Sequence, residues 1–439
     1  MQKGVDQENQ VLQNNRFDTR RRSEVKENVQ KGIGIAMIPI LSIFALGASQ
    51  GGVNAGMATM AMNFPEAGPN IGYVVSMVAL GMIPAGILSG ILTGRFIKYK
   101  TTILIAMVCY IVSGIAPFFL PNDVPFATLL VFRFIFGVAV GWSYPLASAL
   151  TFKLIHNEGQ RATWLGVGMA FFNIGTIFME LAGGYLALVS WQHTFLVYLI
   201  GIIPLVLVAT MLKEPPKDIE QEKEIAAAEG AEVDTKIPAI VWPYVILLTC
   251  ACALAMPTIL YCSMIMASSF GADAGQSGML LSAMTVVGML SGFTLGPCYK
   301  LLRKWLMPVA CLWLGIIFAG CAIFAPAPGE GNMIMYIVCF LVGHWGFAII
   351  IPGTSNILTN LVPIGAATKT MGVFTAFHQA GCFLATPVAT MMTALLGLNP
   401  MLGPAMYHDL MMPCCIGVIV CGVLYIVLAA VTKMRATEA

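Results

Sequence analysis

The sequence predicts an all-α membrane protein with twelve transmembrane helices in two pseudo-symmetric six-helix bundles. Three observations predict this fold class: the composition, the number of long apolar segments and an internal repeat. Of the 439 residues, 58% are hydrophobic and only 10% are charged, and the mean hydropathy is +0.83. A soluble core cannot cover so much apolar side chain, so the composition excludes a soluble enzyme.

The apolar segments set the domain organisation. A window of about 19 residues finds twelve of them, each near the roughly 20 residues that a helix needs to cross the hydrocarbon layer. The predicted spans are 33–58, 71–93, 102–120, 126–150, 163–189, 192–212, 239–266, 275–297, 305–325, 332–356, 367–396 and 408–432. The predicted units are a polar N-terminus (1–32), a six-helix bundle (33–212), a charged linker (213–237), a second six-helix bundle (238–432) and a short tail (433–439).

The basic residues predict the orientation of the spans. Of the 23 Lys and Arg residues, 22 lie in the termini or in the loops after even-numbered spans, whereas loops after odd-numbered spans hold only acids and His. Basic loops stay in the cytoplasm, so both termini and the linker are predicted to be cytoplasmic in a multi-pass protein of the cytoplasmic membrane. The N-terminus carries no apolar segment of its own, and we expect no cleaved signal peptide.

The two halves of the chain resemble each other. Span 2 ends GMIPAGILSGILTG and span 8 ends SAMTVVGMLSGFTLG, at an offset of 202 residues. Spans 5 and 11 share Gly, Val, Ala, Phe and Gly at an offset of 206 residues, which places Asn173 in register with Gln379. Two similar pairs in the same order favour a duplication, and transporters are commonly built from such repeats.

Three short motifs resemble those of one family. The loop after span 2 reads GILTGRFIKYK, span 4 carries Arg133 with Gly137 four residues later, and span 5 carries GTIFMELAGG. In these motifs and in its overall organisation, the chain resembles the major facilitator superfamily over nearly its whole length. Gly94 stands where the family's loop has an Asp, and Met179 and Glu180 replace a Gly-Pro pair of the antiporter-like motif. The resemblance implies that spans 1, 4, 7 and 10 line a central cavity and that spans 3, 6, 9 and 12 face lipid.

Two side chains of opposite charge lie deep in the predicted spans, Arg133 in span 4 and Glu180 in span 5. A charge in the hydrocarbon layer needs a partner, a wet cavity or a change of protonation. The helical rise places both at about 10 to 13 Å from the same outer face, so we expect that they can meet. Two interpretations stay open: a structural ion pair that locks spans 4 and 5 together, or a site for solute and protons.

Further polar side chains suggest the wall of a cavity in the N-terminal half. Asn173 shares a helix face with Glu180, and span 1 places Gln50 and Asn54 on one face. Tyr144 in span 4 adds a phenol group. We predict that Gln50, Asn54, Tyr144 and Asn173, together with Arg133, contact the solute.

The C-terminal half offers a matching set. Gln379 and His378 lie in span 11, His344 and Trp345 in span 10, and Tyr261 in span 7. Because His titrates near neutral pH, His378 is a second candidate for proton coupling beside Glu180, although a hydrogen-bonded structural His is the simpler interpretation. We predict that Tyr261, His344, Trp345 and Gln379 contact the solute.

No cofactor or metal site is expected. The twelve cysteines lie mostly singly in apolar runs, without the paired spacing of a zinc site. The absence of a P-loop argues against an ATP-driven pump. The predicted partners are a small-molecule solute, protons and the lipid bilayer, but not nucleic acid, and we expect a monomer.

The leading hypothesis is a secondary active transporter that moves a small organic solute by alternating access, driven by protons through Glu180. An intramembrane Arg favours an anionic solute, because guanidinium binds carboxylate through two parallel hydrogen bonds. The alternative within transport is an exporter that exchanges amphiphilic drugs or metabolites for protons. A non-transporting receptor or a channel is disfavoured, since the chain has neither a signalling domain nor a repeated filter loop.

Overall fold

The computed structural model describes residues 34–94, 96–155, 158–215, 237–362, 367–398 and 405–432. All regular structure in these ranges is helical apart from two isolated bridges, so the predicted all-α class is confirmed. The predicted N-terminus, the tail and nearly all of the predicted linker lie outside the described residues.

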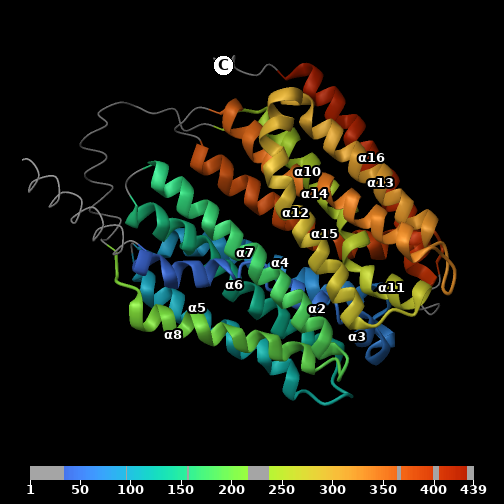
Figure 1. The fold of residues 1–439 in the computed structure, drawn as a ribbon, viewed down its shortest axis with the longest axis horizontal. Coiled ribbons are helices and arrows are strands. Elements are labelled where there is room, and N and C mark those ends of the chain that lie inside the picture. The colour runs from blue at the N-terminus through green and yellow to red at the C-terminus, as the bar shows by residue number, and fades with distance from the viewer. Residues whose placement is uncertain are drawn as a thin grey trace, which may run out of the picture.

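Helices follow one another in the order of the predicted spans (Figure 1). The N-terminal half contains the helix Gly34–Phe44, α2 (Gly51–Asn54), α3 (Met57–Asn63), η1 (Pro65–Gly72), α4 (Tyr73–Leu92), α5 (Tyr99–Ile115), η2 (Ala116–Phe119), α6 (Phe126–Leu154), α7 (Glu158–Ala187), η3 (His193–Gly201) and α8 (Ile202–Met211). The C-terminal half contains α10 (Val241–Leu260), α11 (Cys262–Phe270), α12 (Ala274–Leu302), η4 (Arg303–Trp305), α13 (Leu306–Phe324), α14 (Met333–Leu361), α15 (Ala367–Leu395) and α16 (Ala405–Val431).

Nine helical stretches in the described ranges are long and apolar enough to cross a membrane. One of them, Ala274–Phe324, is 51 residues long and contains both α12 and α13, which correspond to predicted spans 8 and 9. The remaining two predicted spans correspond to α15 and to the interrupted first span. The observed helices are therefore consistent with twelve spans.

The first span is not the continuous helix that its apolar run predicts. After Phe44, the backbone N–H groups of Leu46, Gly47, Ser49 and Gly51 each bond to a carbonyl three residues earlier. After the short α2, the N–H of Gly56 again bonds to a carbonyl three residues earlier, and α3 begins at Met57. Four glycines in ten residues explain the change, because glycine disfavours a regular α-helix and packs closely against its neighbours.

The two halves meet along two helix pairs, α4 with α15 and α7 with α12. In α12, the first turns from Ala274 to Thr285 are mostly buried, whereas residues 286–300 are mostly exposed or half-buried. In α7 the buried residues lie instead in the last turns of the helix, from Gly175 onward. The halves therefore touch at the end that carries the loops after odd-numbered spans.

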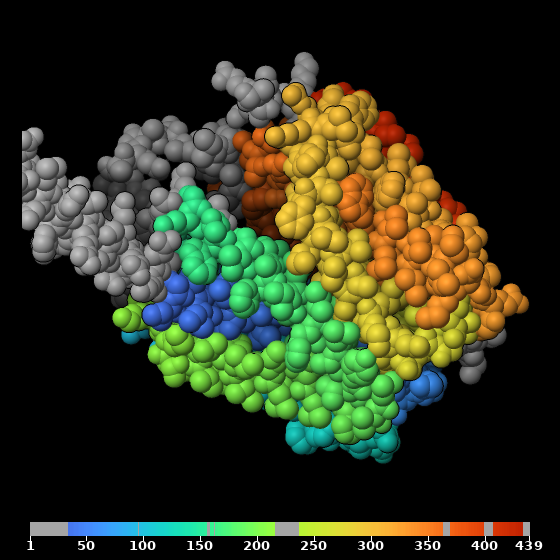
Figure 2. Space-filling model, viewed as in Figure 1, coloured from blue at the N-terminus to red at the C-terminus, as the bar shows by residue number. Residues whose placement is uncertain are grey.

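At the opposite end the halves separate. Figure 1 shows α7 and α12 converging toward α2, α3 and α11 and diverging in the other direction. Figure 2 shows a hollow between the green start of α7 and the surfaces of α12 and α15. We call this space the central hollow.

Candidate functional site

Glu180 lies where the two halves touch. Its side chain is 3% exposed, and its Oε2 accepts a hydrogen bond of 2.9 Å from the Oγ1 of Thr285 on α12. On the other side, Gly51 of the first span approaches it so closely that a Cβ atom there would lie 3.3 Å from the carboxyl group. The carboxyl group thus links α7 to both the first span and the opposite half.

Small residues make this close packing of α7 possible. A Cβ atom at Gly175 or Gly183 would overlap the carbonyl oxygen of Ala45 or Gly52, respectively, in the first span. A Cβ atom at Gly184 would lie 2.6 Å from the carbonyl oxygen of Ala274 on α12. Such positions, where backbones approach directly, are typical of helix contacts in membranes.

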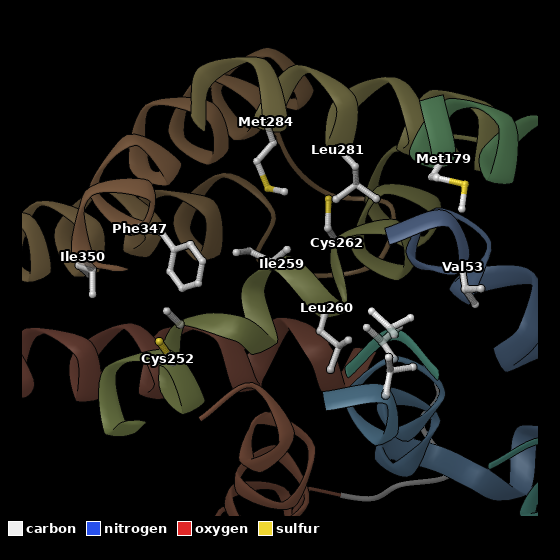
Figure 3. Packing of buried hydrophobic residues seen from close by; sticks show 14 of the residues in the cluster. Val53, Met179, Cys252, Ile259, Leu260, Cys262, Leu281, Met284, Phe347 and Ile350 are labelled. Atoms are coloured by element: carbon white, nitrogen blue, oxygen red, sulfur yellow. The ribbon is translucent and has the colours of Figure 1, made fainter. Parts of the chain in front are cut away.

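The surroundings of the Glu180–Thr285 bond are apolar. Leu281, Met284, Cys262 and Met179 are all at least nine-tenths buried. Figure 3 shows Leu281 of α12 and Cys262 of α11 pointing toward one another, with Met179 of α7 on the side of the N-terminal half. A hydrogen bond enclosed by such groups is electrostatically stronger than one in water.

Arg133 and Glu180 do not form the direct contact that the sequence led us to expect. Both residues are described, and no ion pair joins them. Arg133 is 1% exposed; its Nε donates to the carbonyl of Val74 at 2.6 Å and its Nη1 to the Tyr198 hydroxyl at 3.0 Å. The guanidinium also lies 5.0 Å from the ring centre of Phe136. These contacts hold Arg133 inside the N-terminal half, between α4, α6 and η3.

Backbone of the first span lies between the two charged residues. The Tyr198 hydroxyl, which accepts from Arg133, donates to the carbonyl of Ser49 at 3.2 Å. Two residues further along, Gly51 contacts Glu180. The side chains of Arg133 and Glu180 thus bond to different neighbours.

The polar residues predicted in the first span keep unused hydrogen-bonding atoms. The Oε1 of Gln50 and the Oδ1 of Asn54 are buried and have no partner among the described residues. Asn173 instead bonds to the carbonyl of Met169 in its own helix at 2.9 Å. Tyr144 packs against the rings of Phe44 and Phe172, on the side of Gly47.

The candidate site residues of the C-terminal half form two groups. One group lies where the two halves touch, and the other lies inside the C-terminal half. Gln379 reaches across to Met82, with its Nε2 3.0 Å from the sulfur, and the Tyr261 hydroxyl donates to the carbonyl of Pro69 at 2.8 Å. Tyr261 therefore ties the two halves together at their closed end.

The other three C-terminal candidates stay within their own half. The Nδ1 of His344 is buried without a partner in the described residues, and the Nε2 of His378 lies 3.7 Å from the sulfur of Cys382. Trp345 donates to Thr294 on α12 and packs against Trp313 on α13. Trp345 thus contributes to helix packing.

Several contact residues were not predicted. Ser76 and Thr386 place their hydroxyl oxygens 2.8 Å apart across α4 and α15, and the Tyr407 hydroxyl donates to the carbonyl of Gly68 at 3.1 Å. Ser282 of α12 donates to the carbonyl of Ile177 on α7 at 3.2 Å. Hydroxyl groups in apolar helices give little signal in a sequence, because they often bond to a carbonyl of their own helix. Within the described ranges, no group of three or more His, Cys, Asp or Glu side chains is placed to bind a metal ion.

Comparison with known proteins identifies the family of this arrangement. Residues 39–386, which are well over half of the chain, match the profile of the Major Facilitator Superfamily. The chain belongs to the major facilitator superfamily. The resemblance drawn from the motifs is thereby confirmed, and the relatives that match the chain are named as transporters.

Two individual proteins that are similar to parts of the chain are named as transporters. The niacin transporter NiaP of Acinetobacter baylyi is 28% identical over 165 residues, which cover 37% of this chain and 36% of NiaP. A probable inorganic phosphate transporter of Oryza sativa subsp. japonica is 34% identical over 128 residues, which cover 27% of this chain and 22% of that protein. The matches thus span about a third or less of these relatives.

Solved structures of superfamily transporters share the fold. The nucleoside transporter NupG has a TM-score of 0.69 at 14% identity, covering 90% of this chain and 100% of that chain. The xylose transporter XylE from E. coli, in an inward open conformation, has a TM-score of 0.68 at 15% identity, covering 88% of this chain and 95% of that chain. At these identities the likeness shows the fold alone.

Proposed function

We propose that the chain is a proton-coupled transporter of small-molecule solutes that works by alternating access, with Glu180 as the group that carries the coupling proton. The observation that supports this role most directly is the position of the carboxyl group, buried at the contact of the two halves and bonded across it to Thr285. Any movement that separates α7 from α12 breaks this bond and brings Glu180 to water. Proton exchange and the conformational change then involve the same group.

The proposed orientation follows the basic residues. With both termini and the linker in the cytoplasm, the closed contact lies on the outer side and the central hollow opens to the cytoplasm. Rocking of the two halves would close the hollow and open the outer side, where Ser282, Thr285 and Tyr261 now hold them together.

For the solute we propose a small organic anion bound between the halves. The Nη2 of Arg133 is buried without a hydrogen-bond partner in the described residues, so we propose that this nitrogen donates to an anionic group of the solute. Niacin and inorganic phosphate, named for two relatives, are both anionic near neutral pH. Gln50, Asn54 and His344, each with an unpartnered buried atom, are proposed to contact the solute.

The experiment that tests coupling compares Glu180→Gln with the wild type in proteoliposomes. A thermal-shift screen with nicotinate, phosphate, xylose and nucleosides first selects a solute, since a ligand that binds the folded state raises the unfolding midpoint. The glutamine variant mimics a permanently protonated carboxyl group. Accumulation driven by a proton gradient should be lost, whereas exchange of labelled for unlabelled solute should persist.

Accumulation at the wild-type level in Glu180→Gln would contradict the proposal and move attention to His378. Reversing the proton gradient in the same vesicles separates uptake with protons from the alternative, export in exchange for protons.

A further inference from the structure

The internal repeat relates the two polar contacts between the halves. The offset of 206 residues that pairs Asn173 with Gln379 also pairs Glu180 with Thr386. Each of these two equivalent residues bonds across the contact: Glu180 to the hydroxyl of Thr285 at 2.9 Å, and Thr386 to the hydroxyl of Ser76 at 2.8 Å. The helices α7 and α15 are equivalent in the repeat, and each forms a hydrogen bond to the opposite half from the same position of the repeat.

The two contacts differ in one chemical respect. The contact between α4 and α15 joins two hydroxyl groups, which stay neutral at any physiological pH. The contact between α7 and α12 contains a carboxyl group, and all four side chains are less than 9% exposed. Only one of two otherwise equivalent contacts can therefore change its charge.

Among the residues that the structure describes, the neighbours of Glu180 include no cationic side chain. The first span contributes Gly51, α12 contributes Thr285, and α11 contributes the Cys262 thiol as the nearby titratable group. An ionised carboxylate is unfavourable in such a site, so the protonated group favours the closed contact and the ionised group favours its opening. The hydroxyl of Thr285 offsets part of this cost, because a hydrogen bond to an ionised group is stronger than one to a neutral group.

We infer that Thr285 is a positioning residue for coupling, which sets how strongly the ionisation of Glu180 opens the contact between α7 and α12. This inference rests on the proposed role of Glu180. The equivalent pair, Ser76 with Thr386, holds the halves together independently of pH.

The test measures hydrogen exchange by mass spectrometry on the full chain in lipid nanodiscs, without any solute. Peptides that cover 177–184 and 277–285 report opening of the contact, since amides in packed helices exchange when they open. Exchange is compared in mildly acidic and mildly alkaline buffer, after division by the intrinsic rate of an unstructured peptide. In the wild type, opening should increase at alkaline pH.

Three variants separate the possibilities. Thr285→Val, which keeps the shape but loses the donor, should enlarge the alkaline increase by about tenfold, the size expected when a buried hydrogen bond to an ionised group is lost. Thr285→Ser keeps the donor and should behave as the wild type. Ser76→Ala, the matched control, should raise exchange equally at both pH values and leave their ratio unchanged.

Two outcomes would overturn the inference in distinguishable ways. If Glu180→Gln abolishes the alkaline increase but Thr285→Val retains the wild-type ratio, Thr285 plays no part although the proposed function stands. If Glu180→Gln itself keeps the wild-type increase, Glu180 is not the group that responds to protons, and the proposed function fails together with the inference.

Discussion

Gly183 of α7 packs directly on the backbone of Gly52, so closely that a Cβ atom at Gly183 would overlap the carbonyl oxygen of Gly52. The first span and α7 therefore touch backbone to backbone beside Glu180. This contact depends on glycine at position 183 and gives a direct test of the packing.

Gly183→Ala should destabilise the protein by about 1 to 3 kcal/mol, the usual cost of inserting a methyl group where no space exists. Gly166→Ala lies on the same helix, where a Cβ atom would meet nothing within 4 Å, and serves as the matched control. Alanine there should leave stability unchanged or raise it by up to about 1 kcal/mol. Thermal unfolding in detergent measures both, and equal midpoints would contradict the observed contact.

Arg133 and Glu180 should behave as independent sites. Arg133→Met leaves the Val74 carbonyl and the Tyr198 hydroxyl without their donor and should cost about 1 to 3 kcal/mol. Because no ion pair joins the two charges, the double variant with Glu180→Gln should equal the sum of the single effects within about 0.5 kcal/mol. A double variant that is more stable than the sum of the two single effects predicts, by more than this margin, would indicate an ion pair between them.

Arg133→Lys tests the proposed anion site. Lysine keeps the charge but loses the planar arrangement of donors, so it should weaken solute binding more than it weakens proton coupling. The binding constant of the selected solute reports binding, and the ratio of accumulated to external solute in vesicles reports coupling. Both are measured for Arg133→Lys and for the wild type. A variant with unchanged binding would show that the unpartnered Nη2 does not face the solute.

The closed end of the contact should loosen when its phenol donors are removed. Tyr261→Phe loses the hydrogen bond to the Pro69 carbonyl and should populate states in which the outer ends of the halves are further apart. Spin labels at positions 123 and 330, in exposed loops of different halves, report this distance by pulsed EPR. Tyr425→Phe, which loses a bond to the Tyr244 carbonyl within one half, should leave the distance unchanged.

The orientation has its own test. A single cysteine at position 225 should be unreachable for a membrane-impermeant reagent added outside cells, whereas one at position 123 should react. The physical reason is the restriction of basic residues to one side. The opposite pattern would reverse the assignment of the closed end to the outside.

Hydropathy was sufficient to place the helices, since long apolar runs in a membrane have little alternative to a helix. The interruption of the first span was not predicted. The four glycines from Gly47 to Gly56 lie in an apolar run, and hydropathy alone predicts a continuous helix there. The pairing of Arg133 with Glu180 was wrong for a related reason. Helical rise gives the depth of a residue, but the direction of its side chain depends on how neighbouring helices pack.

The partners of Glu180 could not be found from composition, since Thr285 is one of many hydroxyl residues in apolar helices. The repeat did contain more information than was used, because the register of Asn173 with Gln379 already pairs Glu180 with Thr386. What it could not give was the helix that each of them faces.

The glycine-rich faces of α7 have a consequence for the speed of the transport cycle. Interlocked side chains must change rotamer before two helices can part, which raises the activation barrier. Where Gly184 of α7 and Gly278 of α12 present bare backbone to one another, no such rearrangement is required, and the surfaces can slide or tilt as rigid bodies. The barrier to parting α7 from α12 at this point then comes mainly from the rupture of a few polar contacts, such as the hydrogen bonds of Thr285 and Ser282.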